Sequence, residues 1–175
     1  MNKKSLSKIT INDIVKDSRV NRNTFYYHFE DINSLIKWMF QEETFDFLKT
    51  LDLNADLETA VNFTMNYVEA NRHILNCAVD SLGEKEMKVF FYDDLIALVE
   101  NIVNSAEKRL NISVSNDFKM YICDFYTEAL ASNLLNYFKN KENLDRQKVI
   151  DYISLIFRNS IPFTLLEANK KLNTD

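Results

Sequence analysis

Glycine and proline are almost missing from this chain. Its 175 residues include one glycine, Gly83, and one proline, Pro162. Tight β-hairpin turns depend on these residue types, so a β-rich fold is excluded. Phosphate-cradling loops and dinucleotide-binding turns need several glycines, so enzymes built on those motifs are excluded as well. The sequence therefore predicts an all-α fold.

Cysteine, histidine and long apolar runs are also scarce. Cys77 and Cys123 lie far apart on apolar helical patterns, which indicates reduced core thiols rather than a disulfide. The two histidines and the acidic residues form no catalytic or ligand-spaced cluster, so we expect no metal, no cofactor and no enzymatic activity. The sequence has neither an apolar run of about 18 residues nor an N-terminal apolar signal region. We therefore expect a cytoplasmic protein without a membrane partner.

Charge is divided unevenly along the chain. Residues 1–40 hold seven Lys and Arg against four Asp and Glu, a net charge of +3. The whole chain has a net charge of −5, so residues 41–175 carry −8. This asymmetry fits a nucleic-acid contact confined to the N-terminal part, although charged termini are common in proteins of other kinds.

Residues 9–35 predict two short helices joined by a tight turn, with a third helix beginning after them. Thr10 and Asp13 have the spacing of a capping box at the start of the first helix. Asn21 and Asp31 are suitable N-caps for the second and third helices. Two short helices joined by a turn of about 3–4 residues form the geometry that lays a second helix in the DNA major groove.

The second short helix has one apolar face and one polar face. Phe25 and Phe29 are four residues apart and share the inward face. On the outward face, Arg22 is a candidate for guanine and Asn23 for adenine. Hydroxyl and ring donors nearby suit phosphates, which set register without reading sequence. The predicted DNA-binding residues are Thr10, Arg22, Asn23, Thr24, Tyr26, Tyr27 and His28.

Four sequence blocks in this region form a recognisable pattern. They read Thr10-Ile11-Asn12-Asp13-Ile14-Val15, Ser18-Arg19-Val20-Asn21, Thr24-Phe25-Tyr26-Tyr27-His28-Phe29 and Ile32-Asn33-Ser34-Leu35. Together they resemble the helix-turn-helix of the TetR/AcrR family of bacterial transcription regulators. The resemblance implies that Thr24, Tyr26 and His28 contact the DNA backbone and that Arg22 and Asn23 face base edges. It also implies a homodimer bound to double-stranded DNA at a palindromic operator.

Three features depart from the pattern of that family. The turn glycine is replaced by Arg19, and the lysine that opens the third helix is replaced by Ile32. Only nine residues precede the capping box, where the family has a covering helix of a dozen or more. These departures leave an alternative open, in which the protein is a helical dimeric adaptor or ligand-binding protein that has lost DNA binding.

The remainder of the chain predicts long helices. We divide the chain into a helix-turn-helix DNA-binding head, residues 1–45, and a helical dimerisation and effector-binding body, residues 46–175. Apolar residues at helical spacing predict helices at 32–51, 57–72, 74–79, 84–111, about 116–139 and 145–161. Asp56 is expected as an N-cap, residues 71–73 and Gly83 as breaks, and Pro162 as a kink or restart. The apolar residues expected on the inward face of the helix at 84–111 are Met87, Phe90, Phe91, Leu95, Leu98, Val99, Ile102, Val103, Ala106 and Leu110.

The last two long helices are apolar over more than one face. Such helices commonly pair with their copies in a second subunit to give a four-helix bundle, as the resemblance also implies. The alternative is that they bury each other within a monomer. The predicted dimerisation residues are Tyr121, Phe125, Ala129, Ser132, Ile153, Ile156 and Phe157.

The body is also where an effector is expected, because members of the resembled family usually bind a small molecule there. Its aromatic residues suit an apolar pocket or, equally, a solid core. The body faintly resembles regulators of dihydroxyacetone-kinase operons, which can use a protein co-regulator in place of a free ligand. The predicted pocket residues are Phe63, Tyr67, Phe91, Leu95 and Tyr126.

Overall fold

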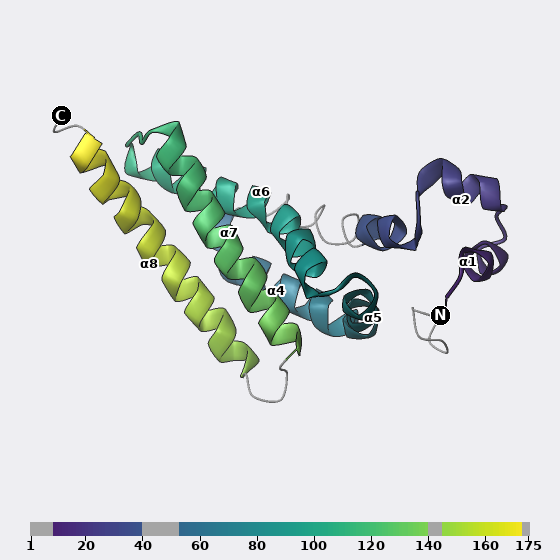
Figure 1. Ribbon diagram of the computed structural model, residues 1–175. Helices are drawn as coiled ribbons and strands as arrows, with labels where there is room; N and C mark the ends of the chain where they lie inside the picture. The colour runs from purple at the N-terminus through teal and green to yellow at the C-terminus, as the bar shows by residue number, and fades with distance from the viewer. Residues whose placement is uncertain (1–8, 40–52, 140–144, 173–175) are drawn as a thin grey trace.

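A computed structural model of the chain describes residues 9–39, 53–139 and 145–172. Every regular element in these ranges is a helix, as predicted, and residues 32–39 are helical as well. Figure 1 shows α1 and α2 at one end of the molecule and the long helices packed together at the other. The boundary expected at residue 45 and the end of the helix expected at 32–51 lie outside the described residues. The bounded helices are α1 (Ile11–Asp17), α2 (Arg22–His28), α4 (Leu53–Ala70), α5 (Arg72–Leu82), α6 (Glu84–Leu110), α7 (Asn116–Lys139) and α8 (Arg146–Leu172).

Local side-chain caps define the helix starts in the head. The Thr10 hydroxyl accepts from the backbone N–H of Asp13 at 3.2 Å, and the Asp13 carboxylate accepts from the backbone N–H of Thr10 at 2.9 Å. The predicted capping box of α1 is therefore confirmed. Asn21 caps α2 by accepting from the N–H of Thr24 at 2.8 Å. These bonds satisfy backbone donors that the first helical turn leaves open.

The turn between α1 and α2 has a left-handed residue. Arg19 has a φ of 58°, where glycine would have no steric cost. The N–H of Val20 then reaches back to the carbonyl oxygen of Val15 at 3.1 Å, which closes α1 in the Schellman pattern. Arg19, which replaces the turn glycine of the resembled family, therefore adopts a conformation that favours glycine.

Two predicted helix boundaries in the body are wrong. Asp56 is no N-cap, because α4 already begins at Leu53. The chain does not restart at Pro162, because α8 runs through it. Ile161 and Leu165 on either side of the proline are completely buried, and this packing holds both halves in one helix despite the missing backbone donor. The break expected at residues 71–73 falls at Asn71, between α4 and α5. The break at Gly83 is confirmed, and Gly83 has a φ of 86°.

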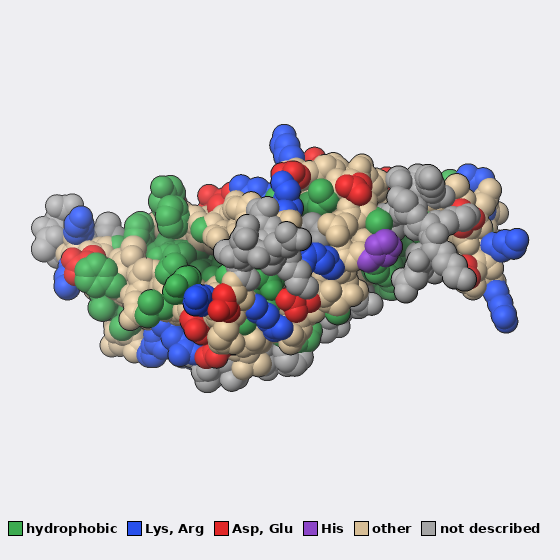
Figure 2. All heavy atoms as spheres, turned by 90° about the horizontal axis from the view of Figure 1, so that it is seen from below, with side chains coloured by type: hydrophobic (Ala, Val, Ile, Leu, Met, Phe, Trp, Pro, Cys, Tyr) green, Lys and Arg blue, Asp and Glu red, His purple; other side chains and the backbone are tan. Residues whose placement is uncertain are grey.

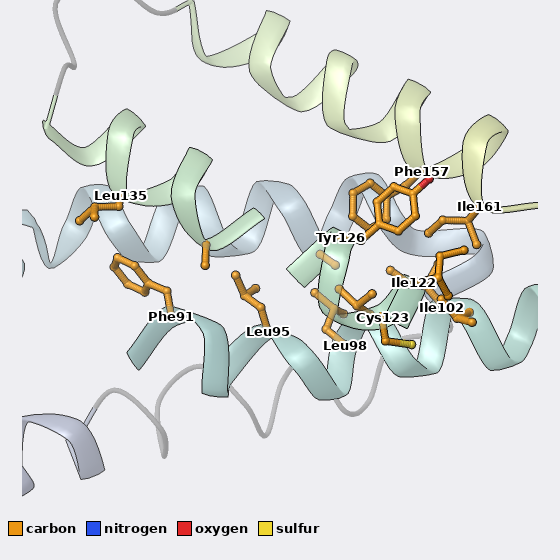
Figure 3. Packing of buried hydrophobic residues seen from close by; sticks show 14 of the residues in the cluster. Phe91, Leu95, Leu98, Ile102, Ile122, Cys123, Tyr126, Leu135, Phe157 and Ile161 are labelled. Carbon is orange, nitrogen blue, oxygen red and sulfur yellow. The ribbon is translucent and has the colours of Figure 1, made fainter. Parts of the chain in front are cut away.

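The core of the body is built around α6. Nine of its ten apolar residues that were predicted to face inward are buried, and the tenth, Leu110, is partly buried against the same core. Figure 3 shows residues of this face packed against α7 and α8: Phe91, Leu95, Leu98 and Ile102 face Ile122, Cys123, Tyr126 and Leu135 of α7 and Phe157 and Ile161 of α8. Side-chain hydrogen bonds and ion pairs join α6 and α7 along their length. The predicted free, buried state of both cysteines is confirmed.

The final helix also has a composition unlike that of a typical surface helix. By length and composition alone, α8 could cross a membrane, since an 18-residue window has a mean hydropathy of 1.2. The expectation of no membrane span, which rested on the absence of an apolar run of about 18 residues, did not predict this property of α8. One face of α8 is buried in the core, through Ile150, Phe157, Ile161 and Leu165. The same helix therefore contributes to the body's interior and also exposes apolar side chains.

Candidate DNA-recognition helix and regulatory body

A stack of aromatic rings holds α2 in place. Phe25 is 5% exposed, and its ring centroid lies 5.6 Å from that of Phe29. Phe29 in turn lies 5.5 Å from Trp38 on the helical residues 32–39. The predicted inward face of α2 is therefore anchored, and its opposite face is turned to solvent.

The other residues of α2 are all exposed. Tyr27 is the most open of the aromatic ones, at 84% exposed, and its ring contacts only that of His28 among the described aromatic pairs. Thr24 donates its hydroxyl proton to the Asn21 side chain at 3.1 Å, so it supports the cap as well as facing outward. Thr10, one of the predicted DNA-binding residues, lies at the start of α1. The other six are together on α2: Arg22, Asn23, Thr24, Tyr26, Tyr27 and His28.

Arg22 and Tyr26 form a pair on the exposed face of α2. Arg22 donates from Nη2 to the Tyr26 hydroxyl oxygen at 3.2 Å. The guanidinium carbon also lies 5.5 Å from the centre of the Tyr26 ring. Sequence reasoning assigned these two residues separate roles and did not anticipate their contact, although an i, i+4 spacing on a helix allows it.

The described part of the head is balanced in charge. Residues 9–39 contain four basic side chains, Lys16, Arg19, Arg22 and Lys37, and four acidic ones, Asp13, Asp17, Glu30 and Asp31. The excess positive charge expected for the head rests on Lys3, Lys4 and Lys8, which lie outside the described residues. Lys16, Arg19 and Arg22 are exposed, and Figure 2 shows basic side chains projecting at this end of the molecule.

An apolar stripe runs along the outside of α7 and α8. On α7 it includes Tyr121 and Phe125, which are 68% and 59% exposed. They line a shallow groove whose other lining residues are Asp124, Glu128, Ala129 and Ser132. On α8 it includes Ile156, as predicted. Sequence reasoning missed three further exposed apolar residues of α8: Tyr152, Leu155 and Phe163. Figure 2 shows apolar side chains gathered on the surface at the end opposite the head.

Two of the predicted dimerisation residues are not on this stripe. Phe157 is 4% exposed and its ring lies 5.1 Å from that of Tyr126. Ile153 lines an internal cavity. Both belong to the inner face of α8. The sequence pattern does not distinguish the inner face from the outer one, because both faces of this helix are apolar.

The internal cavity differs from the predicted pocket. It has a volume of about 50 Å³ and lies between α4, α6, α7 and α8. Of the five predicted residues, Leu95 lines it. Phe91 and Tyr126 are core residues, and Tyr126 donates its hydroxyl to Ser160 at 2.7 Å. Phe63 and Tyr67 are half-buried against the same core. The lining residues are Val61, Thr64, Met65, Leu95, Leu98, Leu130, Asn133, Leu134, Tyr137, Val149 and Ile153.

A buried carboxylate lies in the apolar face of α6. Asp94 is 9% exposed, and burial, together with the neighbouring charge of Asp93, raises its pKa to about 7. Sequence reasoning left Asp94 out of the inward set of α6. The signal was present, since position 94 falls at helical spacing between Phe90 or Phe91 and Leu98.

Comparison with known proteins identifies the class as that of a helical transcription regulator. The family profile TetR_C_8, described as "Transcriptional regulator C-terminal region", matches residues 55–159, from α4 into α8. The match covers more than half of the chain, so the chain belongs to this family of TetR-type regulators. This confirms the family expected from the head motifs.

One relative with a described role is also similar over most of the chain. The HTH-type dhaKLM operon transcriptional activator DhaS of Lactococcus lactis subsp. lactis (strain IL1403) is 22% identical over 135 residues, which cover 75% of this chain and 70% of DhaS. This agrees with the faint resemblance of the body to dihydroxyacetone-kinase operon regulators. No solved structure matches the chain.

Proposed function

We propose that the protein regulates transcription by binding DNA as a homodimer, with α2 as the recognition helix. The main support is the geometry of α2, where one buried ring, Phe25, leaves the rest of the helix exposed. Arg22 is the candidate for reading a guanine edge, and Tyr26 and His28 are candidates for phosphate contacts. Membership of a family of transcription regulators supports the same role.

The homodimer is proposed to form through the outer faces of α7 and α8. Apolar side chains such as Phe125, Ile156 and Phe163 are more than half exposed there. Pairing each helix with its copy would give a four-helix bundle and remove this surface from water. A twofold dimer presents two recognition helices about 34–36 Å apart, or a multiple of this spacing, so the operator is expected to be a palindrome.

Regulation by an effector is proposed to act through the body. A cavity of about 50 Å³ is smaller than the roughly 150 Å³ engineered cavity that accepts benzene. A larger small molecule therefore requires the helices that line this cavity to move apart. A protein co-regulator bound to the outside of the body requires no such movement. The name of the relative DhaS, an activator of the dhaKLM operon, does not favour a free ligand over a protein co-regulator.

A fluorescence-anisotropy titration tests the DNA-binding proposal. Purified full-length chain is titrated against labelled duplexes from the promoter region beside its own gene, and against a shuffled duplex, at two salt concentrations. Saturable, sequence-selective binding that weakens with salt is expected, because phosphate contacts release counterions. Arg22→Ala should weaken the selective binding by about 1–3 kcal/mol. Absence of selective binding at low salt would favour the adaptor hypothesis.

A further inference from the structure

We propose that Tyr26 is a positioning residue for Arg22, so that phosphate contact and base reading by α2 are coupled. This inference rests on the proposed DNA-binding function. A tyrosine that contacts only a phosphate contributes to affinity for every sequence equally. A tyrosine that also holds the base-reading arginine contributes to sequence preference.

The geometry gives Tyr26 two contacts to the same guanidinium. Its hydroxyl oxygen accepts from Nη2 of Arg22 at 3.2 Å, and its ring lies 5.5 Å from the guanidinium carbon. The hydrogen bond fixes the end of the arginine side chain, and the ring contact fixes the ring plane over which the guanidinium lies. Together they restrict a long side chain that would otherwise populate many rotamers in solvent.

Tyr26 is itself held by the interior of the head. Its ring packs edge-on against Phe25 with centroids 5.7 Å apart, and Phe25 is buried. Arg22 is therefore connected through Tyr26 to the aromatic stack that includes Phe29 and Trp38. The arginine keeps a defined direction although its own side chain is exposed.

The pair keeps enough hydrogen-bonding capacity to bind a phosphate and a guanine edge at the same time. A tyrosine hydroxyl can accept one bond and still donate its own proton, and a guanidinium has five N–H donors. Tyr26 can thus donate to a phosphate while accepting from Arg22, and the remaining donors of Arg22 can face O6 and N7 of a guanine. Accepting from a cation also polarises the hydroxyl and strengthens its bond to the phosphate.

A double-mutant cycle on DNA tests the coupling. Affinities of the wild-type chain, Arg22→Ala, Tyr26→Phe and the double variant are measured on the selected duplex and on its single-base-pair variants. The position at which Arg22→Ala loses its preference identifies the base pair that Arg22 reads. Tyr26→Phe removes the hydroxyl contact to Arg22 and keeps the ring beside the guanidinium, so the preference at that base pair should fall by about threefold, part of the effect of freeing one side chain. The effects of the two substitutions should not multiply in the double variant.

Tyr27→Phe is the matched control. Tyr27 is adjacent and more exposed, and its ring contacts His28 rather than Arg22. The Tyr27→Phe variant should leave the preference at the base pair read by Arg22 unchanged. An equal loss on every duplex for Tyr26→Phe, with multiplicative effects in the double variant, would overturn the coupling while leaving DNA binding in place.

A measurement without DNA separates the inference from the proposed function. The heteronuclear NOE of the Arg22 Nε–H group in the free full-length chain reports the order of the side chain. It should fall in Tyr26→Phe and stay unchanged in Tyr27→Phe. An unchanged value in Tyr26→Phe would overturn the pairing, whether or not the wild-type chain binds DNA.

Discussion

Asp94 is a carboxyl group in a largely apolar environment. It lies on the inner face of α6 among Phe90, Phe91 and Leu98, which are all buried. Desolvation disfavours the charged form of a carboxyl, and the nearby Asp93 adds repulsion. The folded chain therefore binds a proton at Asp94 over a pH range in which the unfolded chain does not.

This gives a prediction for stability against pH. The pKa of Asp94 is raised from 3.8 to about 7 in the folded state, so its contribution to the free energy of unfolding falls as pH rises from about 4 to 7. Between pH 5 and pH 8 the wild-type chain should lose about 2–3 kcal/mol relative to Asp94→Asn. Urea denaturation of both chains at several pH values measures the difference.

Asp93→Asn is the control for this experiment. Asp93 is exposed and contributes only repulsion. Replacing Asp93 should preserve the fall in stability with rising pH and move the midpoint of that fall to lower pH, because the repulsion that raises the pKa of Asp94 is removed. The same pH dependence in Asp94→Asn as in the wild type would show that another group is responsible.

At the scale of elements, Arg146 joins the first turn of α8 to α4 through several hydrogen bonds. Arg146 donates to the Asn66 side chain at 2.6 Å, to the Asn62 backbone oxygen at 3.3 Å and to Glu69 at 3.4 Å. Tyr137 of α7 donates to the same Glu69 carboxylate at 2.7 Å. Burial, together with this hydrogen bond, raises the pKa of Tyr137 to about 12. Three helices therefore meet at one polar cluster beside the internal cavity.

Arg146→Met should loosen this junction. The substitution keeps an apolar stem and removes the donors, so we expect a loss of about 1 kcal/mol, since the arginine is partly exposed. Amide exchange in the first turn of α8 should also accelerate. Hydrogen exchange and thermal unfolding measure both effects.

Lys148→Met provides the comparison on the same helix turn. Lys148 is 67% exposed and lies 4.0 Å from Asp145. An exposed pair of this kind contributes less than about 0.5 kcal/mol. Equal destabilisation by the two substitutions would contradict the role given to Arg146.

The elements also show which features are readable from sequence. The caps at Thr10 and Asn21 and the inward face of α6 were predicted because they depend on neighbours three or four residues away. The inner and outer faces of α8 were not separated, because both are apolar and only tertiary contacts assign Phe157 to the core. The cavity could not be read from the sequence for the same reason, since a cavity is defined by how helix faces meet, and the ligand-pocket residues stay a prediction. Likewise, the DNA-binding role of the residues on α2 stays a prediction.

For the whole molecule, the outer stripe of α7 and α8 is expected to decide the assembly. Phe125→Glu and Ile156→Glu each place a charge on this stripe, where both native side chains are more than half exposed. Burying an unpaired charge in an apolar interface is costly, so each variant should be a monomer. Light scattering should give twice the chain mass of 20.6 kDa for the wild type and the single mass for the variants.

Val89→Glu tests whether any exposed apolar position has the same effect. Val89 lies on α6 and is 45% exposed. This variant should remain a dimer. A dimeric Phe125→Glu chain would place the interface elsewhere.

The contrast between short-range and long-range bonds has a consequence for folding kinetics. Each described helix start in the head is closed by a partner three residues away, as in the Asp31–Ser34 pair. In the body, Arg146 reaches Asn62 across 84 residues. Local contacts form quickly, whereas distant ones must first overcome the entropy of closing a long loop. The two short helices should therefore be in place early, and the docking of α8 onto α4 should limit the rate at which the chain becomes native.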